Sequence, residues 1–225
     1  MYSSIPVFAR ANGRWDETPT ALARGVLPVR QVASALVASV GGDRVATIHG
    51  LEPAWFGASV WGRAFTVRGA PGDNLALHQA LAEAEPDEVI VIDVGDERRC
   101  AHLGDILTLA AQKRGIAGFV LNGAVRDRFA LAQLGVPVFH LGTSPRQPRK
   151  AVPGRFRIPI ELLGARIRPG DVIVADTDGI VVVPAELWEN LLQEAVALEA
   201  REQEICARLA QGETTLEIFG LAASR

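Results

Sequence analysis

Two short segments, each of which comes after an apolar, strand-like run and opens a helix, hold the residue types best suited to chemistry. Residues 103–107 read Leu-Gly-Asp-Ile-Leu and residues 122–127 read Asn-Gly-Ala-Val-Arg-Asp, each at the start of an expected helix. The first segment carries Asp105, and the second carries Arg126 and Asp127. One or two carboxylates, completed by water and substrate oxygens, suit Mg²⁺ or Mn²⁺. A planar guanidinium can hold a carboxylate. The pattern therefore indicates a metal-assisted reaction on a small oxo acid.

A purely structural role explains the same three side chains. Aspartate is common at helix starts, where it accepts hydrogen bonds from backbone N–H groups. Asp105 and Asp127 could thus be helix caps, and Arg126 could be a surface ion-pair partner. Spacing alone leaves both interpretations open.

The elements that must position these segments alternate between strand and helix. We expect strands at 59–68, 88–93, 117–121 and 136–141, helices at 75–85, 103–114 and 127–134, and a polar loop at 95–102. Asp73 or Asn74 should cap the first of these helices. The alternation predicts an α/β fold with a parallel or mixed sheet. Because ligands bind outside the carboxyl ends of such strands, both candidate segments should lie at one edge of the sheet.

The remaining chain has a different pattern. A helix is expected at 31–40, short strands at 155–160, 162–167, 171–175 and 180–183, a long amphipathic helix at 185–209 and a last short helix at 214–221. The first fifteen residues have no clear period and are expected to form an arm or a frayed end. We interpret residues 1–225 as one domain, with a core at about 30–185 and C-terminal helices at 186–221.

Composition argues against several classes of protein. The 225 residues are 48% hydrophobic with a net charge of −3, which is typical of a globular protein and unlike a nucleic-acid clamp. No apolar run approaches the ~20 residues of a membrane helix, and no secretory signal is visible. Only two cysteines, Cys100 and Cys206, are present, so a disulfide framework is not expected and the cytoplasm is the default location.

The scarcity of lysine narrows the chemistry further. Lys113 and Lys150 are the only lysines, and both lie in polar segments rather than in an apolar pocket that would activate an amine. We therefore do not expect a Schiff-base enzyme. No two glycines have G-x-G spacing, so a dinucleotide-binding loop is not expected either.

A chain of motifs in a fixed order resembles one known family. The motifs are Pro-Gly-Asp-Asn-Leu at 71–75, Leu-Gly-Asp at 103–105, Asn-Gly-Ala-Val-Arg-Asp at 122–127, Gly-Val-Pro-Val-Phe at 135–139, Leu-Gly-Thr-Ser-Pro at 141–145, Arg-Pro-Gly-Asp at 168–171 and residues 175–184. They resemble the family of 4-hydroxy-4-methyl-2-oxoglutarate/4-carboxy-4-hydroxy-2-oxoadipate aldolases and RraA-type regulators of ribonuclease E. The aldolase signature of that family, Asp-x20-Arg-Asp, is matched by Asp105, Arg126 and Asp127.

The resemblance implies a swivelling β/β/α-type sandwich with a C-terminal helical arm, assembled as a homotrimer or homohexamer. It implies that Asp127 binds the metal, that Asp105 holds a metal-bound water, and that Arg126 binds the oxo-acid end of the substrate. The substrate carboxylate would meet the backbone of Gly104, Asp105, Ile106 and Leu107. The implied reaction cleaves a 4-hydroxy-2-oxo acid to pyruvate through an enolate, with oxaloacetate decarboxylation as a companion activity.

Three departures from the family pattern concern specificity. Ser34 stands where an acid is common, and residues 96–99 are more charged than the expected glycine-rich loop. Glu199 and Glu202 are both candidates for the glutamate that a C-terminal helix supplies to a neighbouring subunit in aldolases. Two further functions stay open: a protein-binding regulator of ribonuclease E, and a related metal-dependent lyase or hydratase acting on another hydroxy acid.

Overall fold

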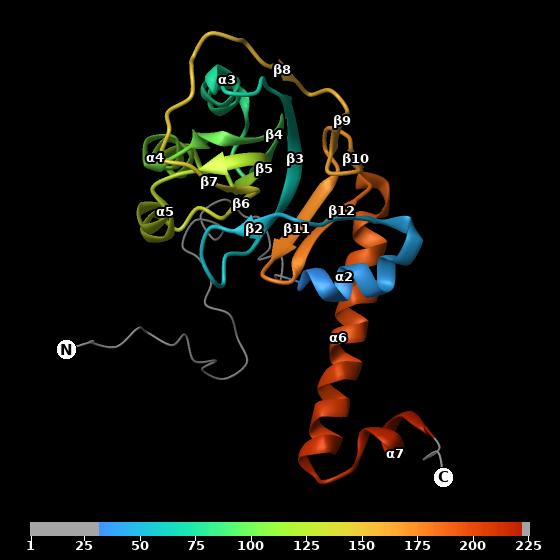
Figure 1. Cartoon of the computed structure of the whole chain (residues 1–225). Helices are drawn as coiled ribbons and strands as arrows, with labels where there is room; N and C mark the ends of the chain where they lie inside the picture. Colours follow the sequence, from blue (N-terminus) through green and yellow to red (C-terminus); the bar gives the residue numbers. More distant parts are fainter. Residues whose placement is uncertain (1–31, 222–225) are drawn as a thin grey trace, which may run out of the picture. The chain divides into compact units, whose positions relative to one another are not determined.

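The central sheet is built from the alternating segments in the middle of the chain. The computed structural model describes residues 32–221, so the arm expected over the first fifteen residues lies outside the described residues. The elements of this region are β3 (Val60–Arg68), α3 (Leu75–Glu83), β4 (Glu88–Leu103), α4 (Asp105–Arg114), β5 (Gly118–Val125), α5 (Arg128–Leu134) and β6 (Val138–His140). Each predicted helix and strand of this region is present, which confirms the α/β class (Figure 1).

Helices cover one face of the parallel part of the sheet. β3, β4, β5 and β6 are neighbours in that order, and each pair is parallel. Side chains alternate between the two faces of a strand, and Phe65, Ile90 and Phe119 share one apolar cluster with Leu77 of α3 and Leu131 of α5. In Figure 1, α3, α4 and α5 lie along this side of the strands.

The other face packs against an antiparallel half of the same sheet. Its strands are β1 (Ala46–Ile48), β2 (Glu52–Pro53), β8 (Arg155–Phe156), β11 (Val172–Asp176) and β12 (Gly179–Val183). The short strand β7 (Gly142–Thr143) pairs with β5 and is parallel to it. The strand order is β1-β12-β11-β3-β4-β5-β6-β2, with β7 beside β5 and β8 beside β3. A separate hairpin joins β9 (Ile160–Leu162) to β10 (Ala165–Ile167). Val89 and Val120 cluster with Leu162 and Ile173, so two β layers meet here.

An outer helical layer completes the sandwich. It comprises α2 (Ser34–Gly41), a 3₁₀ turn (Gly42–Arg44), a second 3₁₀ turn (Ala185–Leu187), α6 (Trp188–Ala210) and α7 (Thr215–Phe219). Val37 of α2 and Leu191 of α6 pack on Val174 and Val181. Only Leu191 and Ala195 of α6 are buried, and the helix extends beyond the sheet (Figure 1). The mixed sheet and C-terminal helix agree with the predicted fold class. No helix among the described residues is long and apolar enough to cross a membrane.

The polar loop predicted at 95–102 is wrong, because β4 continues through it to Leu103. The pairing with β5 shifts register three times here, from Ile92↔Leu121 to Glu97↔Gly123, then to Ala101↔Ala124 and to Leu103↔Val125. Such bulges admit glycine and charged residues into a strand and re-aim the chain. The expected strand at 162–167 is also interrupted, by the turn that joins β9 to β10.

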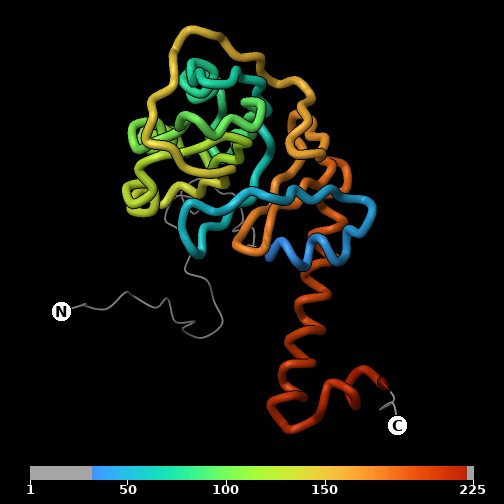
Figure 2. Tube along the Cα trace, viewed as in Figure 1, coloured from blue at the N-terminus to red at the C-terminus, as the bar shows by residue number. Residues whose placement is uncertain are grey.

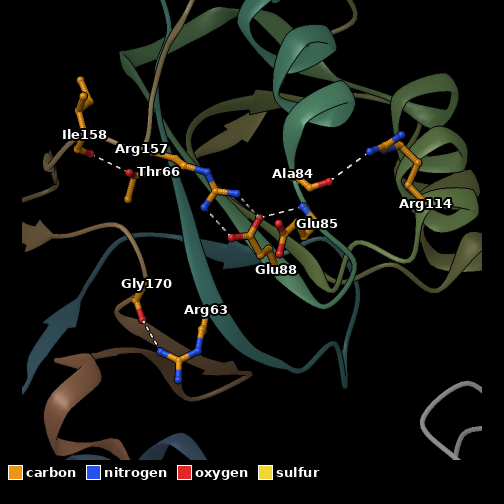
Figure 3. Close-up of polar contacts among 9 residues, drawn as sticks. All are labelled: Arg63, Thr66, Ala84, Glu85, Glu88, Arg114, Arg157, Ile158 and Gly170. Carbon is orange, nitrogen blue, oxygen red and sulfur yellow. Dashed lines mark hydrogen bonds and ion pairs between the residues drawn. The ribbon is translucent and has the colours of Figure 1, made fainter. Parts of the chain in front are cut away.

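A long connection, residues 145–157, crosses the helical face, and we call it the strap (Figure 2). Its far end is fixed to the sheet. Arg157 donates to both carboxylate oxygens of Glu88, at 3.0 and 3.3 Å, and its guanidinium lies 4.7 Å from the centroid of the Phe65 ring. Next to this ion pair, the Thr66 hydroxyl donates to the carbonyl of Ile158 at 2.7 Å (Figure 3). The strap is therefore a structured wall over α3 and α4.

Candidate functional site

The carboxyl ends of β4 and β5 bring the two candidate segments together. Leu103 and Val125, the last residues of these parallel strands, are register partners. The Arg126 N–H donates to the Leu103 carbonyl at 3.0 Å, which ties the start of one connection to the end of the neighbouring strand. Gly104 then precedes α4, and Asp127 precedes α5. Two helix N-termini therefore lie at one edge of the sheet, where their free N–H groups favour anions.

Asp127 is held in an uncommon backbone conformation that turns its side chain away from its own helix. Its φ is 56° and its ψ is 34°, in the left-handed region that few residues other than glycine adopt. The carboxylate does not cap α5. Instead, Oδ2 lies 3.2 Å from Arg126 Nε and 3.5 Å from the backbone nitrogen of Asp105. The cap interpretation of Asp127 therefore fails.

Gly104 leaves the space that this arrangement needs. A Cβ atom at Gly104 would lie 2.7 Å from Asp127 Oδ2 and 3.0 Å from Arg126 Nε, closer than real side chains approach. Its φ of −149° is ordinary extended backbone, so the requirement for glycine comes from space alone. Asp105 behaves more like a capping residue, because its Oδ1 accepts a hydrogen bond from the Ile106 N–H in the first turn of α4 at 2.8 Å. The structure thus brings Gly104, Asp105, Arg126 and Asp127 together.

Two cavities meet at Arg126. One has a volume of about 260 Å³ and is lined by Asn74, His78, residues 101–107, Arg126, Gln147, Pro148 and Lys150. The other has a volume of about 400 Å³ and is lined by residues 125–128 and 143–145. Arg126 lines both, while Asp105 lines the first and Asp127 the second. Arg126 therefore stands between two compartments that could receive the two ends of a small acid.

The wall of the first cavity includes a buried polar atom whose hydrogen-bonding capacity is unused. The buried Asn74 donates from Nδ2 to the His102 carbonyl at 3.0 Å, yet its Oδ1 has no hydrogen-bond partner among the described residues. Buried polar groups usually have a partner, so this oxygen is suited to a ligand or a water molecule. Burial lowers the pKa of His102, and burial followed by the charge of Lys150 lowers the pKa of His78. Both imidazoles are therefore biased toward the neutral form.

Sequence reasoning missed the contribution of Asn74, His78 and Lys150 to this cavity. Asn74 was interpreted only as a possible helix cap and Lys150 only as part of a polar segment, and no signal marked His78. The motif at 71–75 could have drawn attention to Asn74. Lys150 reaches the cavity only because the strap crosses the helices, a long-range contact that no local pattern reports.

The three departures in the sequence have structural explanations away from the two cavities. The Ser34 hydroxyl donates to Asp176 at 2.6 Å, which fastens α2 to β11. Glu97 is buried and accepts hydrogen bonds from Arg99, which lower the pKa of this carboxyl to about 2. Glu199 and Glu202 lie on α6, in the outer helical layer.

The donor set at the sheet edge fits one kind of metal. Among residues 32–221, no group of three or more histidine, cysteine or acidic side chains could hold an ion. An ion here would rely on Asp127, with Asp105 nearby, and on water and substrate oxygens. Mg²⁺ and Mn²⁺ accept sites with only one or two protein carboxylates, completed by water and substrate oxygens, whereas structural zinc needs four protein ligands.

Fold and site together define an α/β protein with a candidate anion-binding site at one edge of its sheet. The chain belongs to the RraA-like family, described as Aldolase/RraA, whose family model matches residues 30–182. This confirms the family that the motifs predicted.

Three relatives illustrate the range of the family. A protein of Halalkalibacterium halodurans, provisionally named a 4-hydroxy-4-methyl-2-oxoglutarate aldolase, is 44% identical over 144 residues, which cover 64% of this chain and 69% of the relative. The solved structure of Streptomyces coelicolor RraAS2, described as an unusual member of the RNase ES inhibitor RraA family, is 30% identical, with a TM-score of 0.72 and coverage of 80% and 96%. The RNA-processing inhibitor RraA of Thermus thermophilis is 28% identical, with a TM-score of 0.63 and coverage of 67% and 92%.

Proposed function

We propose that this chain is a divalent-metal-dependent aldolase that cleaves a 4-hydroxy-2-oxo acid, such as 4-hydroxy-4-methyl-2-oxoglutarate, to pyruvate, and that it also decarboxylates oxaloacetate. The observation that carries the proposal is the position of the Asp127 carboxylate. It leaves its own helix uncapped and faces Arg126 and the N-terminus of α4 across the space kept by Gly104. A merely structural aspartate at this position would cap α5.

Each residue of the site has a role in the proposed reaction. The N-terminus of α4, from Gly104 to Leu107, receives the substrate carboxylate, since its N–H groups and helix dipole favour an anion. Arg126 faces the 2-oxo oxygen, where negative charge grows as the bond between C3 and C4 breaks. Because this charge is largest in the transition state, the guanidinium stabilises the transition state more than the substrate.

Proton transfer falls to Asp105. It orients the water that takes the proton from the C4 hydroxyl, while the electron pair of the broken C–C bond moves into the pyruvate enolate. Protonation of the enolate at C3 gives pyruvate, and C4 leaves as a second oxo acid. Asp127 would hold Mg²⁺ or Mn²⁺, which supplies Lewis-acid polarisation of the oxo group when bound. The same enolate forms when oxaloacetate loses CO₂.

The test is pyruvate release from 4-hydroxy-4-methyl-2-oxoglutarate and from oxaloacetate, with Mg²⁺ and with EDTA. We expect release from both, lost in EDTA and lost in Asp127→Asn. Asp87→Asn is the matched control, because Asp87 is an exposed aspartate that also has a positive φ, of 67°. Full activity of Asp127→Asn would refute the assignment of the metal ligand, and metal-independent release would refute the mechanism.

We also propose that the chain assembles as a homotrimer or homohexamer, as its family suggests. Three large apolar side chains are strongly exposed in the single chain: Phe56 at 95%, Ile106 at 70% and Phe129 at 80%. Exposed apolar surface of this kind marks protein contacts. Light scattering of the purified protein tests the assembly, and a monomer at micromolar concentration would contradict it.

Two relatives support a second candidate function. The Thermus protein is described as an RNA-processing inhibitor and the Streptomyces protein as an unusual member of an RNase ES inhibitor family, and both share this fold. A regulator of ribonuclease E would act by surface contact and would not need Asp127. The test is whether a ribonuclease co-purifies with the protein from a native lysate. A regulator should recover it equally well as the wild type and as Asp127→Asn.

A further inference from the structure

Lys150 is held by fixed backbone on both of its sides. The Arg149 N–H donates to the Gly72 carbonyl at 2.8 Å, and the Arg149 carbonyl accepts from the Asn74 N–H at 2.9 Å. On the other side, the Ala151 N–H donates to Asp73 Oδ2 at 2.8 Å. The backbone of Lys150 thus cannot move unless the strap separates from residues 72–74.

Asp73 connects the strap to the start of α3. Its other carboxylate oxygen, Oδ1, accepts from the Leu75 N–H at 3.0 Å, so one side chain serves a helix start and the strap together. The residue is only 1% exposed. Burial by itself would raise the pKa of Asp73, but hydrogen bonds from backbone N–H groups of Leu75, Ala151 and Val152 hold this pKa below its ordinary value. Asp73 is therefore a carboxylate at neutral pH.

The segments that Asp73 joins are two walls of the same cavity. Asn74 and His78 contribute the wall from α3, and Gln147, Pro148 and Lys150 contribute the wall from the strap. Lys150 forms no ion pair among residues 32–221, while its charge reaches His78. A lysine fixed at the backbone and left without a carboxylate partner is suited to bind an anion in the cavity.

We propose that Asp73 is a positioning residue, which fixes the strap so that the Lys150 ammonium lies in the cavity wall and binds a second negative group of the substrate. The inference rests on the proposed function, since it places the 2-oxo acid end at Arg126. It assigns Lys150 to the distal carboxylate that the proposed substrate already carries.

Binding of two stable probes, measured by calorimetry in the presence of Mg²⁺, tests the inference. 2-Oxoglutarate has a 2-oxo acid end and a distal carboxylate, and 2-oxobutyrate has only the former. Since a hydrogen bond between charged groups is stronger than a neutral one, we expect the wild type to prefer 2-oxoglutarate by about tenfold or more. Lys150→Met should abolish this preference while leaving the affinity for 2-oxobutyrate unchanged.

Variants of Asp73 separate positioning from folding. Asp73→Asn loses the charge, whereas Asp73→Ser keeps a hydroxyl that can accept from the Leu75 N–H but is too short to reach the strap. Both should lose most of the preference, because Lys150 must then be ordered at a cost during binding. The matched control is Asp171→Asn. Asp171 is also a buried aspartate in a Pro-Gly-Asp turn that accepts from two backbone N–H groups, of Arg168 and Ala185, and it lines neither cavity.

Each outcome decides the inference. Loss of the preference in Lys150→Met and in every Asp73 variant that folds, with the preference kept in Asp171→Asn, supports it. A wild type without preference overturns the role of Lys150, and a preference kept in Asp73→Ser overturns the role of Asp73. Pyruvate release is measured separately, so a protein that keeps the binding preference but releases no pyruvate would count against the proposed reaction alone.

Discussion

Replacing Gly104 by alanine tests the geometry of the site without disturbing the fold. The added Cβ would lie 2.7 Å from Asp127 Oδ2 and 3.0 Å from Arg126 Nε, whereas ordinary contact begins near 3.4 Å. The carboxylate must therefore retreat by about 0.7 Å and the guanidinium by about 0.4 Å. The extended φ of −149° accepts alanine, and Gly→Ala at a compatible position changes stability by only about 0.4–1 kcal/mol.

Displacements of this size are large for catalysis. Since a misplacement of about 1 Å can cost about 100-fold in rate, we expect kcat/KM of Gly104→Ala to fall by about 30- to 100-fold. The affinity for Mn²⁺, measured by electron paramagnetic resonance, should fall as well, because Asp127 is the proposed ligand. Gly142→Ala is the control, since a Cβ at Gly142 meets nothing within 4 Å. Wild-type kcat/KM and Mn²⁺ affinity in a folded Gly104→Ala protein would refute the reasoning.

Three further predictions concern buried groups away from the proposed reaction. Hydrogen bonds from Arg99 lower the pKa of Glu97 to about 2, so the stabilisation by this carboxylate should be complete above about pH 4.5 and be lost as the pH falls to 2. The unfolding temperature of Glu97→Gln should therefore depend less on pH in this range than that of the wild type. Burial lowers the pKa of His140 to about 4, so the wild type should lose stability as the pH falls from 6.5 to 4, and His140→Phe should unfold with less pH dependence there. Burial raises the pKa of the Cys100 thiol, so iodoacetamide at pH 7.5 should modify only the exposed Cys206 in the native protein, and mass spectrometry counting two adducts would contradict this.

Local sequence signals predicted the layers around the site because each signal has a local cause. The helix α4 ends at Gly115 and α5 at Gly135, and both glycines have the positive φ that closes a helix. The helix starts at Asp105 and Arg128 follow parallel strands, so their meeting at one edge follows from topology. The fold class and the grouping of Asp105, Arg126 and Asp127 were therefore accessible from the chain alone.

Other features depend on contacts between distant segments. The continuation of β4 past Asp93 depends on pairing with β5 through bulges, which offset the poor strand propensity of Gly95 and Asp96. The place of Lys150 in a cavity wall depends on a buried carboxylate some 77 positions earlier, at Asp73. The sequence shows that the strap is basic and polar, but such a pattern does not indicate which elements the strap lies against. Roles in catalysis stay predictions that the experiments above can test.

The length of α6 has a consequence for how the protein opens. Leu191 and Ala195 pack its first turns against the sheet, whereas no residue of α6 beyond Ala195 is buried. The capping box at the start of α7 stabilises that helix alone. Stability is uneven in such a helix, and its loosely packed end exchanges amide hydrogens through fraying rather than through global unfolding. The protein therefore has a gradient of protection along a single helix, with slow exchange near Leu191 and fast exchange near Leu209. A partner that covered the exposed part of α6 would shift the boundary between the two toward the C-terminus.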